Sequence, residues 1–207
     1  MISRSRWAIA RGGGLALGVL VGLGGIVGCG GGDGTSDAGT TTTDAASSPP
    51  PSGCAPEAIT LIGLVNAYRA ENGLPAIPAS SSLCTVAATH TRDLAEHHPD
   101  TGMCNLHSWS DQGSWTPCCY TPDHAQAQCM WDKPRELSDY PGNGYENAFA
   151  GSDDPMAALE GWKHSPGHNA VILNQDIWAD HPWGAIGADI HAGYAVLWFG
   201  EEPDPAR

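Results

Sequence analysis

The most informative stretch of this 207-residue chain reads Trp162-Lys163-His164-Ser165-Pro166-Gly167-His168-Asn169-Ala170-Val171-Ile172-Leu173-Asn174. Just before it, Asp154-Pro155 is a helix N-cap followed by a first-turn proline, so we expect a helix from there to about His164. Pro166 and Gly167 interrupt that helix. The stretch therefore predicts a short helix, a sharp break and a further helical turn over residues 169–173.

Two longer helices are expected earlier in the chain. Apolar residues recur at helical spacing over residues 56–72, where Pro56 suits the first turn and Gly73 suits the stop. A second apolar stripe covers residues 82–97 and includes His90, which we interpret as a hydrogen-bonded core histidine. Residues 99–145 are rich in Gly, Pro, Trp and Cys. We expect this long segment to be irregular and separately stabilised.

The C-terminal part of the chain favours β structure. Residues 183–190 and 194–199 are rich in β-forming side chains and are separated by His191-Ala192-Gly193, which predicts a hairpin. Helices followed by strands indicate an α+β fold, with helices packed on an antiparallel sheet as a layered sandwich.

The charge of the chain limits its partners. It carries 9 Lys and Arg against 23 Asp and Glu, a formal net charge of −14. Binding to nucleic acid or to anionic lipid headgroups needs clustered basic residues, which are missing. We therefore expect no nucleic acid, and as partner an unidentified protein, glycan or small ligand.

The N-terminus indicates export. Arg4, Arg6 and Arg11 precede an apolar run over residues 15–27, which is the pattern of a signal peptide. The run ends in Ile26-Val27-Gly28-Cys29 and resembles the lipobox of bacterial lipoproteins. Removal of residues 1–28 would leave a lipidated Cys29 as the new N-terminus. The alternatives are an ordinary secretion signal cleaved elsewhere or an uncleaved anchor. A lipoprotein would contact the membrane only through its anchor, in the periplasm or at the cell surface.

The rest of the chain divides into a tether and one domain. After Cys29, residues up to 53 are small and polar and cannot offset the entropy cost of ordering, so residues 29–53 form a lipidated, disordered linker. The globular domain is expected over residues 54–202, with a Cys-rich insertion at about 110–143 and a tail at 203–207.

Six cysteines remain when Cys29 is set aside. An even number in an exported domain indicates three disulfides, whose connectivity the sequence does not reveal. The alternative is a zinc site that includes His107 and His124, although the usual CxxC pairs are missing. The candidates for disulfides are Cys54, Cys84, Cys104, Cys118, Cys119 and Cys129.

Several motifs now follow one another in a fixed order. They are Leu64-Val65-Asn66-Ala67-Tyr68-Arg69, Ala88-Thr89-His90-Thr91-Arg92-Asp93, Leu106-His107-Ser108, Gly144-Tyr145-Glu146-Asn147, the stretch from Trp162 to Asn174, and Trp198-Phe199-Gly200. Together they resemble the CAP superfamily (cysteine-rich secretory proteins, antigen 5 and pathogenesis-related proteins), in its bacterial branch with a Ser-Pro-Gly-His motif.

This resemblance implies a three-layer α-β-α sandwich with a shallow cleft. In eukaryotic members two histidines and two glutamates line the cleft and can bind a divalent metal. His107 matches the first histidine and Glu146 the first glutamate. Ser165 stands in the place of the second glutamate and Tyr194 in that of the second histidine, so the set is incomplete. His168 is expected to enter the same cleft from the helix end.

The residues themselves support a related hypothesis. His107, Glu146 and His168 neighbour turn residues, so we expect them on loops that converge. Two imidazoles and a carboxylate with an open position form a known ligand set for zinc, so Zn²⁺ or another divalent cation, held by His107 and His168, is the candidate cofactor. Two imidazoles that merely orient a carboxylate by hydrogen bonds are the alternative.

Three functions are compatible with these features. The first is a non-catalytic binding or interaction module whose cleft holds a divalent metal or a small ligand. The second is a metal-dependent hydrolase of peptide or envelope polymer, in which Glu146 would act as base on metal-bound water. The third is lipid or sterol binding, which the resemblance implies for some eukaryotic members. We place the binding module first.

Overall fold

The computed structural model describes residues 53–205. The signal peptide, Cys29 and nearly all of the expected linker lie outside the described residues. Within residues 53–205, no helix is both long and apolar enough to span a bilayer. The elements are α1 (Pro56–Glu71), α2 (Ser81–His97), α3 (Ala127–Leu137), β1 (Tyr145–Ala150), α4 (Pro155–Lys163), α5 (Pro166–Ile172), the 3₁₀ turn η1 (Asp176–Trp178), β2 (Ala185–His191) and β3 (Tyr194–Gly200).

The three described strands form one antiparallel sheet in the order β1-β3-β2. Strands β2 and β3 are the predicted hairpin, and His191 pairs with Tyr194 across the turn. Both turn residues, Ala192 and Gly193, have positive φ, which suits the twist of a two-residue hairpin loop. Strand β1 joins at the free side of β3, with Glu146 opposite Trp198. It is therefore an edge strand.

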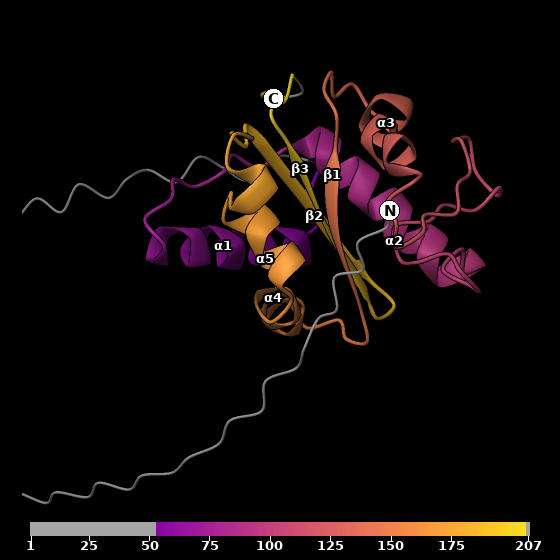
Figure 1. Cartoon of the computed structure of the whole chain (residues 1–207), viewed down its shortest axis with the longest axis horizontal. Coiled ribbons are helices and arrows are strands. Elements are labelled where there is room, and N and C mark those ends of the chain that lie inside the picture. Colours follow the sequence, from indigo (N-terminus) through magenta and orange to yellow (C-terminus); the bar gives the residue numbers. More distant parts are fainter. Residues whose placement is uncertain (1–52, 206–207) are drawn as a thin grey trace, which may run out of the picture. The chain divides into compact units, whose positions relative to one another are not determined.

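Helices cover both faces of the sheet. In Figure 1, α1, α4 and α5 lie on one side of the strands, and α2 and α3 lie on the other. Two buried apolar clusters fill the two interfaces, one around Trp162, Ile186 and Phe199, the other around Leu94, Trp109 and Trp198. The expected three-layer α+β sandwich is confirmed.

Helix α2 packs very closely on the sheet because of a glycine. A Cβ atom on Gly187 would lie 2.3 Å from the backbone carbon of Leu83, so only glycine lets α2 approach β2 this closely. The start of α2 is held by two carboxylate oxygens of Asp204, which accept from the hydroxyls of Ser80 and Ser82 at 2.6 and 2.8 Å. Asp204 lies in the expected tail, so at this residue the tail packs against the domain.

The segment expected to be irregular contains regular structure. Helix α3 forms although Pro134 lies inside it, because a disulfide at Cys129 and a buried Lys133 fix it to its surroundings. Strand β1 forms because the exposed edge of β3 supplies its pairing partner. Both contacts are long-range, so local sequence patterns do not reveal them. Pro166 also starts α5 in its first turn, three residues earlier than the expected turn at 169–173.

The three expected disulfides are present. Cys54 pairs with Cys84, Cys104 with Cys119, and Cys118 with Cys129. All six cysteines are thereby used, which excludes the alternative of a zinc site that includes them. The adjacent residues Cys118 and Cys119 join two different partners, so both ends of the segment between Cys104 and Cys129 are fixed at one point.

We expect the disulfides to contribute unequally to stability. In the chain-entropy model, a closed loop of 30 residues restricts the unfolded chain more than one of 11. Replacing Cys54 and Cys84 by Ala should therefore cost about 3.5 kcal/mol, and replacing Cys118 and Cys129 about 2.7 kcal/mol. Urea unfolding of both double variants checks this order. A larger loss in the second variant would contradict the entropic explanation.

Candidate functional site

The candidate site is built around Glu146 on the edge strand β1. Side chains alternate between the two faces of a strand, so Glu146 faces α2, while its neighbour Asn147 faces α5. The Glu146 side chain is completely buried, and each carboxylate oxygen contacts one histidine. Oε1 lies 2.5 Å from Nδ1 of His90, and Oε2 lies 2.8 Å from Nδ1 of His107.

His90 connects α2 to this carboxylate. It is fully buried, and its Nε2 lies 3.0 Å from the carbonyl oxygen of Ser108. A carbonyl oxygen only accepts, so Nε2 must carry a proton. Nδ1 faces Glu146, which is also an acceptor when ionised, so the His90–Glu146 contact holds a second proton. His90 thus joins the buried carboxylate of β1 to the backbone of the loop that carries Ser108. The imidazole ring stacks on Trp109 at 4.1 Å.

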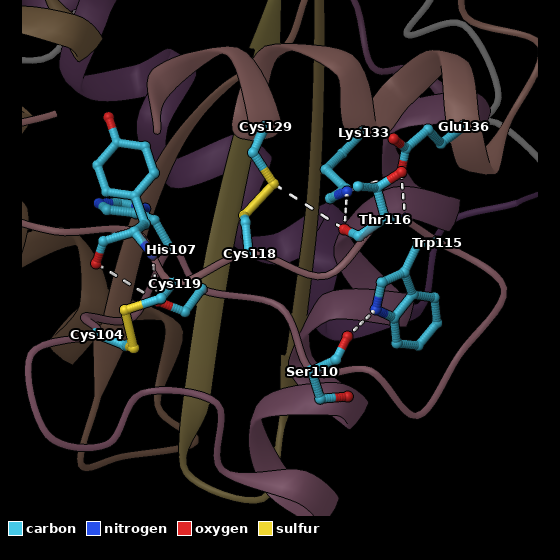
Figure 2. The surroundings of a disulfide bond; sticks show 12 residues. Cys104, His107, Ser110, Trp115, Thr116, Cys118, Cys119, Cys129, Lys133 and Glu136 are labelled. Atoms are coloured by element: carbon cyan, nitrogen blue, oxygen red, sulfur yellow. Dashed lines mark hydrogen bonds and ion pairs between the residues drawn. A yellow bond between two sulfur atoms is a disulfide. The ribbon is translucent and has the colours of Figure 1, made fainter. Parts of the chain in front are cut away.

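His107 lies on a loop that the Cys-rich segment fixes. Its backbone N–H donates to Oδ1 of Asn105 at 3.0 Å, and Cys104, three residues earlier, is bonded to Cys119. Figure 2 shows His107 beside this disulfide. Tyr120, which follows Cys119, packs its ring edgewise against the imidazole at 5.2 Å. Because Nδ1–H of His107 donates to Glu146, its Nε2 presents a lone pair and is the atom available to a ligand.

His168 reaches the same place from the other side of β1. It lies in the first turn of α5, and its Nδ1 is 2.9 Å from the hydroxyl of Ser165, which precedes that helix. Asn147 donates to the carbonyl oxygen of His168 at 3.0 Å. The rings of His168 and His107 are 6.5 Å apart between centroids. Glu146 thus fixes His90 and His107, and its neighbour Asn147 fixes His168.

Electrostatics favours an ionised Glu146 and an uncharged His168. Burial by itself raises the pKa of Glu146, but the charge and hydrogen bonds of His90 and His107 lower it to below its usual value. Burial and the proximity of His107 lower the pKa of His168. An uncharged His168 keeps a ring nitrogen that can bind a metal ion or accept a hydrogen bond.

The structure places the predicted cleft residues in two groups. His107, Glu146, His168 and Ser165 lie together. Tyr194 does not join them: it stands at the far end of β3, opposite Ala150, and its hydroxyl is 3.4 Å from Nδ1 of His98. The expectation that all three central residues lie on loops was wrong for Glu146, which is in β1, and for His168, which is in α5.

Two contributors to the site were not foreseen. His90 was expected to be a buried core histidine, and it is, but its bond to Glu146 makes it part of the site. Its position on the apolar face of a predicted helix gave no sign that its partner would be a carboxylate. Tyr120 lies in the Cys-rich segment, where burial and the negative Glu146 raise the pKa of its hydroxyl.

The family comparison agrees with this architecture. The CAP family, described as the cysteine-rich secretory protein family, matches residues 62–177. The chain belongs to the CAP family. This match confirms the family inferred from the ordered motifs. No curated protein matches the chain.

Three solved structures are similar to this chain. An extracellular protein containing an SCP domain from Bacillus anthracis str. Ames is 18% identical, with a TM-score of 0.51 over 70% of this chain and 40% of that protein. A cysteine-rich secretory protein from Staphylococcus aureus subsp. aureus Mu50 is 17% identical over 70% of this chain and 38% of that one, with a TM-score of 0.45. An outer surface protein from Borrelia burgdorferi is 16% identical over 69% and 90%, also with a TM-score of 0.45. The CAP chain thus spans about two fifths of the first two proteins.

We expect acid to destabilise the domain in two stages. His168 has a lowered pKa, so the unfolded chain binds more protons than the folded one as the pH falls below about 6.5. Glu146 also has a lowered pKa, so its stabilising contribution is present above about 4.5 and is lost as the pH falls further. Urea unfolding from about pH 7 to about pH 3 measures both stages.

Two variants separate these stages. His168→Gln should flatten the upper stage and leave the lower one. Glu146→Gln should flatten the lower stage and cost about 3–5 kcal/mol at neutral pH, because it breaks the buried His90–Glu146 pair. An unchanged acid profile in Glu146→Gln would contradict the lowered pKa of Glu146 as the cause of the lower stage.

Proposed function

We propose that this CAP-domain protein is an exported, lipid-anchored binding module without catalytic activity. Its ligand, a divalent metal ion or a small molecule that imidazole nitrogens can coordinate or hydrogen-bond, binds between His107 and His168. The observation that carries the proposal is the buried Glu146, whose two oxygens are both occupied by histidines while the outer nitrogens of His107 and His168 have no protein partner among the described residues.

The donor set fits a metal ion with few protein ligands. A metal-binding histidine commonly donates its other ring N–H to a carboxylate, as His107 does to Glu146. Two rings on one zinc ion have centroids about 5–6 Å apart, given Zn–N bonds of about 2.0–2.1 Å. The observed 6.5 Å requires a small side-chain adjustment. No group of three or more potential metal ligands occurs within residues 53–205, so we expect weak binding with several open positions.

The same geometry disfavours the metal-dependent hydrolase. A general base must lie within hydrogen-bonding reach of the water it deprotonates. Glu146 is sealed from solvent, and both oxygens already accept from imidazoles. It serves to orient His107, and the described site offers no second carboxylate in its place, since Ser165 stands where the resemblance expected a glutamate.

Lipid or sterol binding also has little support. Two hollows in the described part of the molecule have volumes of about 370 and 400 Å³ and are lined mainly by polar side chains. A lipid tail or a sterol ring system is held by apolar walls. The candidate ligand is therefore polar or ionic.

The cellular location rests on the sequence and the cysteines. The basic and apolar N-terminus ends at Cys29 in a lipobox-like run. Three disulfides suit an oxidising compartment outside the cytosol. We propose lipidation of Cys29 and attachment at the periplasmic or outer face of a membrane.

Metal titration tests the cleft. The purified chain, freed of metal, should bind one Zn²⁺ or Co²⁺, and His107→Ala and His168→Ala should each weaken this binding at least tenfold, because each removes one ligand. Calorimetry and the Co²⁺ absorption spectrum measure it. His191→Ala, on the exposed hairpin, is the matched control and should bind as the parent does. If His107→Ala and His168→Ala both bind Co²⁺ as the parent does, the metal is not held in this cleft.

Fractionation tests the anchor. In a bacterial host that processes lipoproteins, the parent chain should be found with membranes and carry labelled acyl chains. Cys29→Ser should be unlabelled and soluble, because the polypeptide has no other expected contact with the bilayer. Mass spectrometry of the mature N-terminus locates the cleavage. A labelled Cys29→Ser variant would contradict lipidation at Cys29.

A further inference from the structure

A hollow lies away from His107 and His168, between α2 and the loop over residues 110–116. It has a volume of about 400 Å³. We call it the α2 groove. One wall is the outer face of α2, with Thr89, Arg92, Glu96 and His97, and the other is the loop over residues 110–116, with Gln112 and Trp115.

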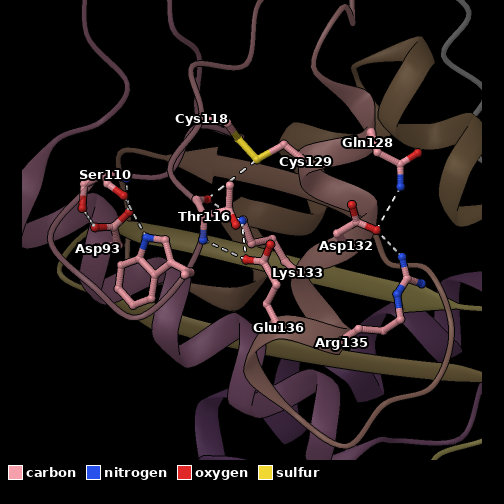
Figure 3. A network of polar contacts seen from close by, with 11 residues as sticks. Asp93, Ser110, Thr116, Cys118, Gln128, Cys129, Asp132, Lys133, Arg135 and Glu136 are labelled. Carbon is pink, nitrogen blue, oxygen red and sulfur yellow. Dashed lines mark hydrogen bonds and ion pairs between the residues drawn. A yellow bond between two sulfur atoms is a disulfide. The ribbon is translucent and has the colours of Figure 1, made fainter.

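The loop wall is firmly anchored although its tip is exposed. At one end the Asp93 carboxylate accepts from the backbone N–H of Ser110 at 2.8 Å and also from its hydroxyl. At the other end, the backbone of Thr116 makes two hydrogen bonds. Its carbonyl oxygen accepts from the Lys133 ammonium at 2.6 Å, and its N–H donates to the Glu136 carboxylate at 3.0 Å. Figure 3 shows both anchors, Asp93 against Ser110 and Thr116 between Lys133 and Glu136.

The indole of Trp115 is fixed inside this loop. Its Nε1–H donates to the carbonyl oxygen of Ser110 at 2.9 Å, as Figure 2 shows. A Cβ atom on Gly113 would lie 2.1 Å from the six-membered ring, so the Gly113 backbone rests directly on it. Trp115 is half-buried and lines the groove, so its apolar indole is held there in one orientation.

The opposite wall carries charged groups without partners. Arg92 is the one basic side chain in residues 53–205 with no hydrogen bond or ion pair, whereas Lys133, Arg135 and Lys163 are all paired with acids. Glu96, one helical turn further along α2, is exposed and is likewise without an ion pair in this part of the chain. His97 uses Nδ1 to bind Asp93 at 3.1 Å. The groove thus offers both donors and acceptors beside an indole.

These features select the kind of ligand. Arg92 and Glu96 carry opposite charges, and the net charge of −14 opposes the approach of anions, so a ligand without negative charge is favoured. The groove offers hydrogen-bond donors, hydrogen-bond acceptors and an apolar indole. A neutral ligand that matches all three has several hydroxyl groups and a ring with an apolar face. We propose that the α2 groove binds a neutral saccharide, with one sugar ring on Trp115 and hydroxyls on Arg92 and Glu96. This proposal is independent of the histidine cleft, which shares no residue with the groove.

Titration of the purified full-length chain with neutral trisaccharides tests this proposal. The probes are N,N′,N″-triacetylchitotriose, cellotriose and maltotriose, each at up to about 5 mM, a concentration that detects dissociation constants in the millimolar range. Tryptophan fluorescence and backbone amide shifts report binding. We expect at least one probe to bind, and Arg92→Gln and Trp115→Leu each to weaken it at least tenfold.

Matched controls keep the result interpretable. Arg135→Gln removes another exposed arginine, and Trp178→Leu removes another half-exposed tryptophan, both outside the groove; each should bind within twofold of the parent. Unfolding by urea establishes that the groove variants are folded. Zn²⁺ binding by Arg92→Gln should equal that of the parent.

Three results would overturn the proposal. They are no binding of any of the three probes, binding unaffected by Trp115→Leu, and binding unaffected by Arg92→Gln. None of them bears on the proposed role of His107 and His168, which the metal titration decides separately.

Discussion

One buried carboxylate organises the functional half of this domain. Glu146 has no access to water, and an isolated ionised carboxylate in that position would cost several kcal/mol. The cost is offset only if donors meet both oxygens. His90 comes from α2, and His107 comes from the loop that follows Cys104. Because both histidines bond to the carboxylate of Glu146, three separate segments are fixed relative to one another. Loss of either contact would release one of these segments from the carboxylate.

The Cys-rich segment extends this arrangement outward. Disulfides to Cys104 and Cys129 meet at the adjacent residues Cys118 and Cys119, and so hold the His107 loop on one side and α3 on the other. The buried Lys133 of α3 has its ammonium 5.4 Å from the ring centre of Trp109, the same ring on which His90 stacks. The segment is therefore a wall of the histidine cleft as well as a wall of the α2 groove. Its covalent links supply rigidity that a short segment with little core of its own lacks.

The two proposed sites differ in chemistry and in origin. The histidine cleft is formed by residues within the family's ordered motifs, and it exposes ring nitrogens over a sealed carboxylate. The α2 groove is formed by a helix face and by the loop that begins the Cys-rich insertion, and it exposes an indole and unpaired charges. Under the two proposals, the histidine site binds a polar or ionic ligand and the α2 groove binds a neutral saccharide. Neither role needs a reaction, which is consistent with the inaccessible position of Glu146.

The sequence by itself determined the elements whose signals are local. Apolar periodicity and caps placed α1, α2 and α4, alternation and a turn placed the hairpin of β2 and β3, and the order of motifs identified the family. The tertiary structure decided the rest. Strand β1 needs the edge of β3, α3 needs Cys118 and Lys133, and the pairing of six cysteines depends on which of them meet in space.

The site divides in the same way. Sequence motifs brought His107, Glu146 and His168 together as candidates, because they occur in motifs of one family. Only the fold could show that His90 is the partner of Glu146, since 56 residues separate them, and that Tyr194 lies with His98 instead. Residue types and local periodicity can be read directly from the sequence, whereas contacts between distant residues form only when the helical layers pack on the sheet.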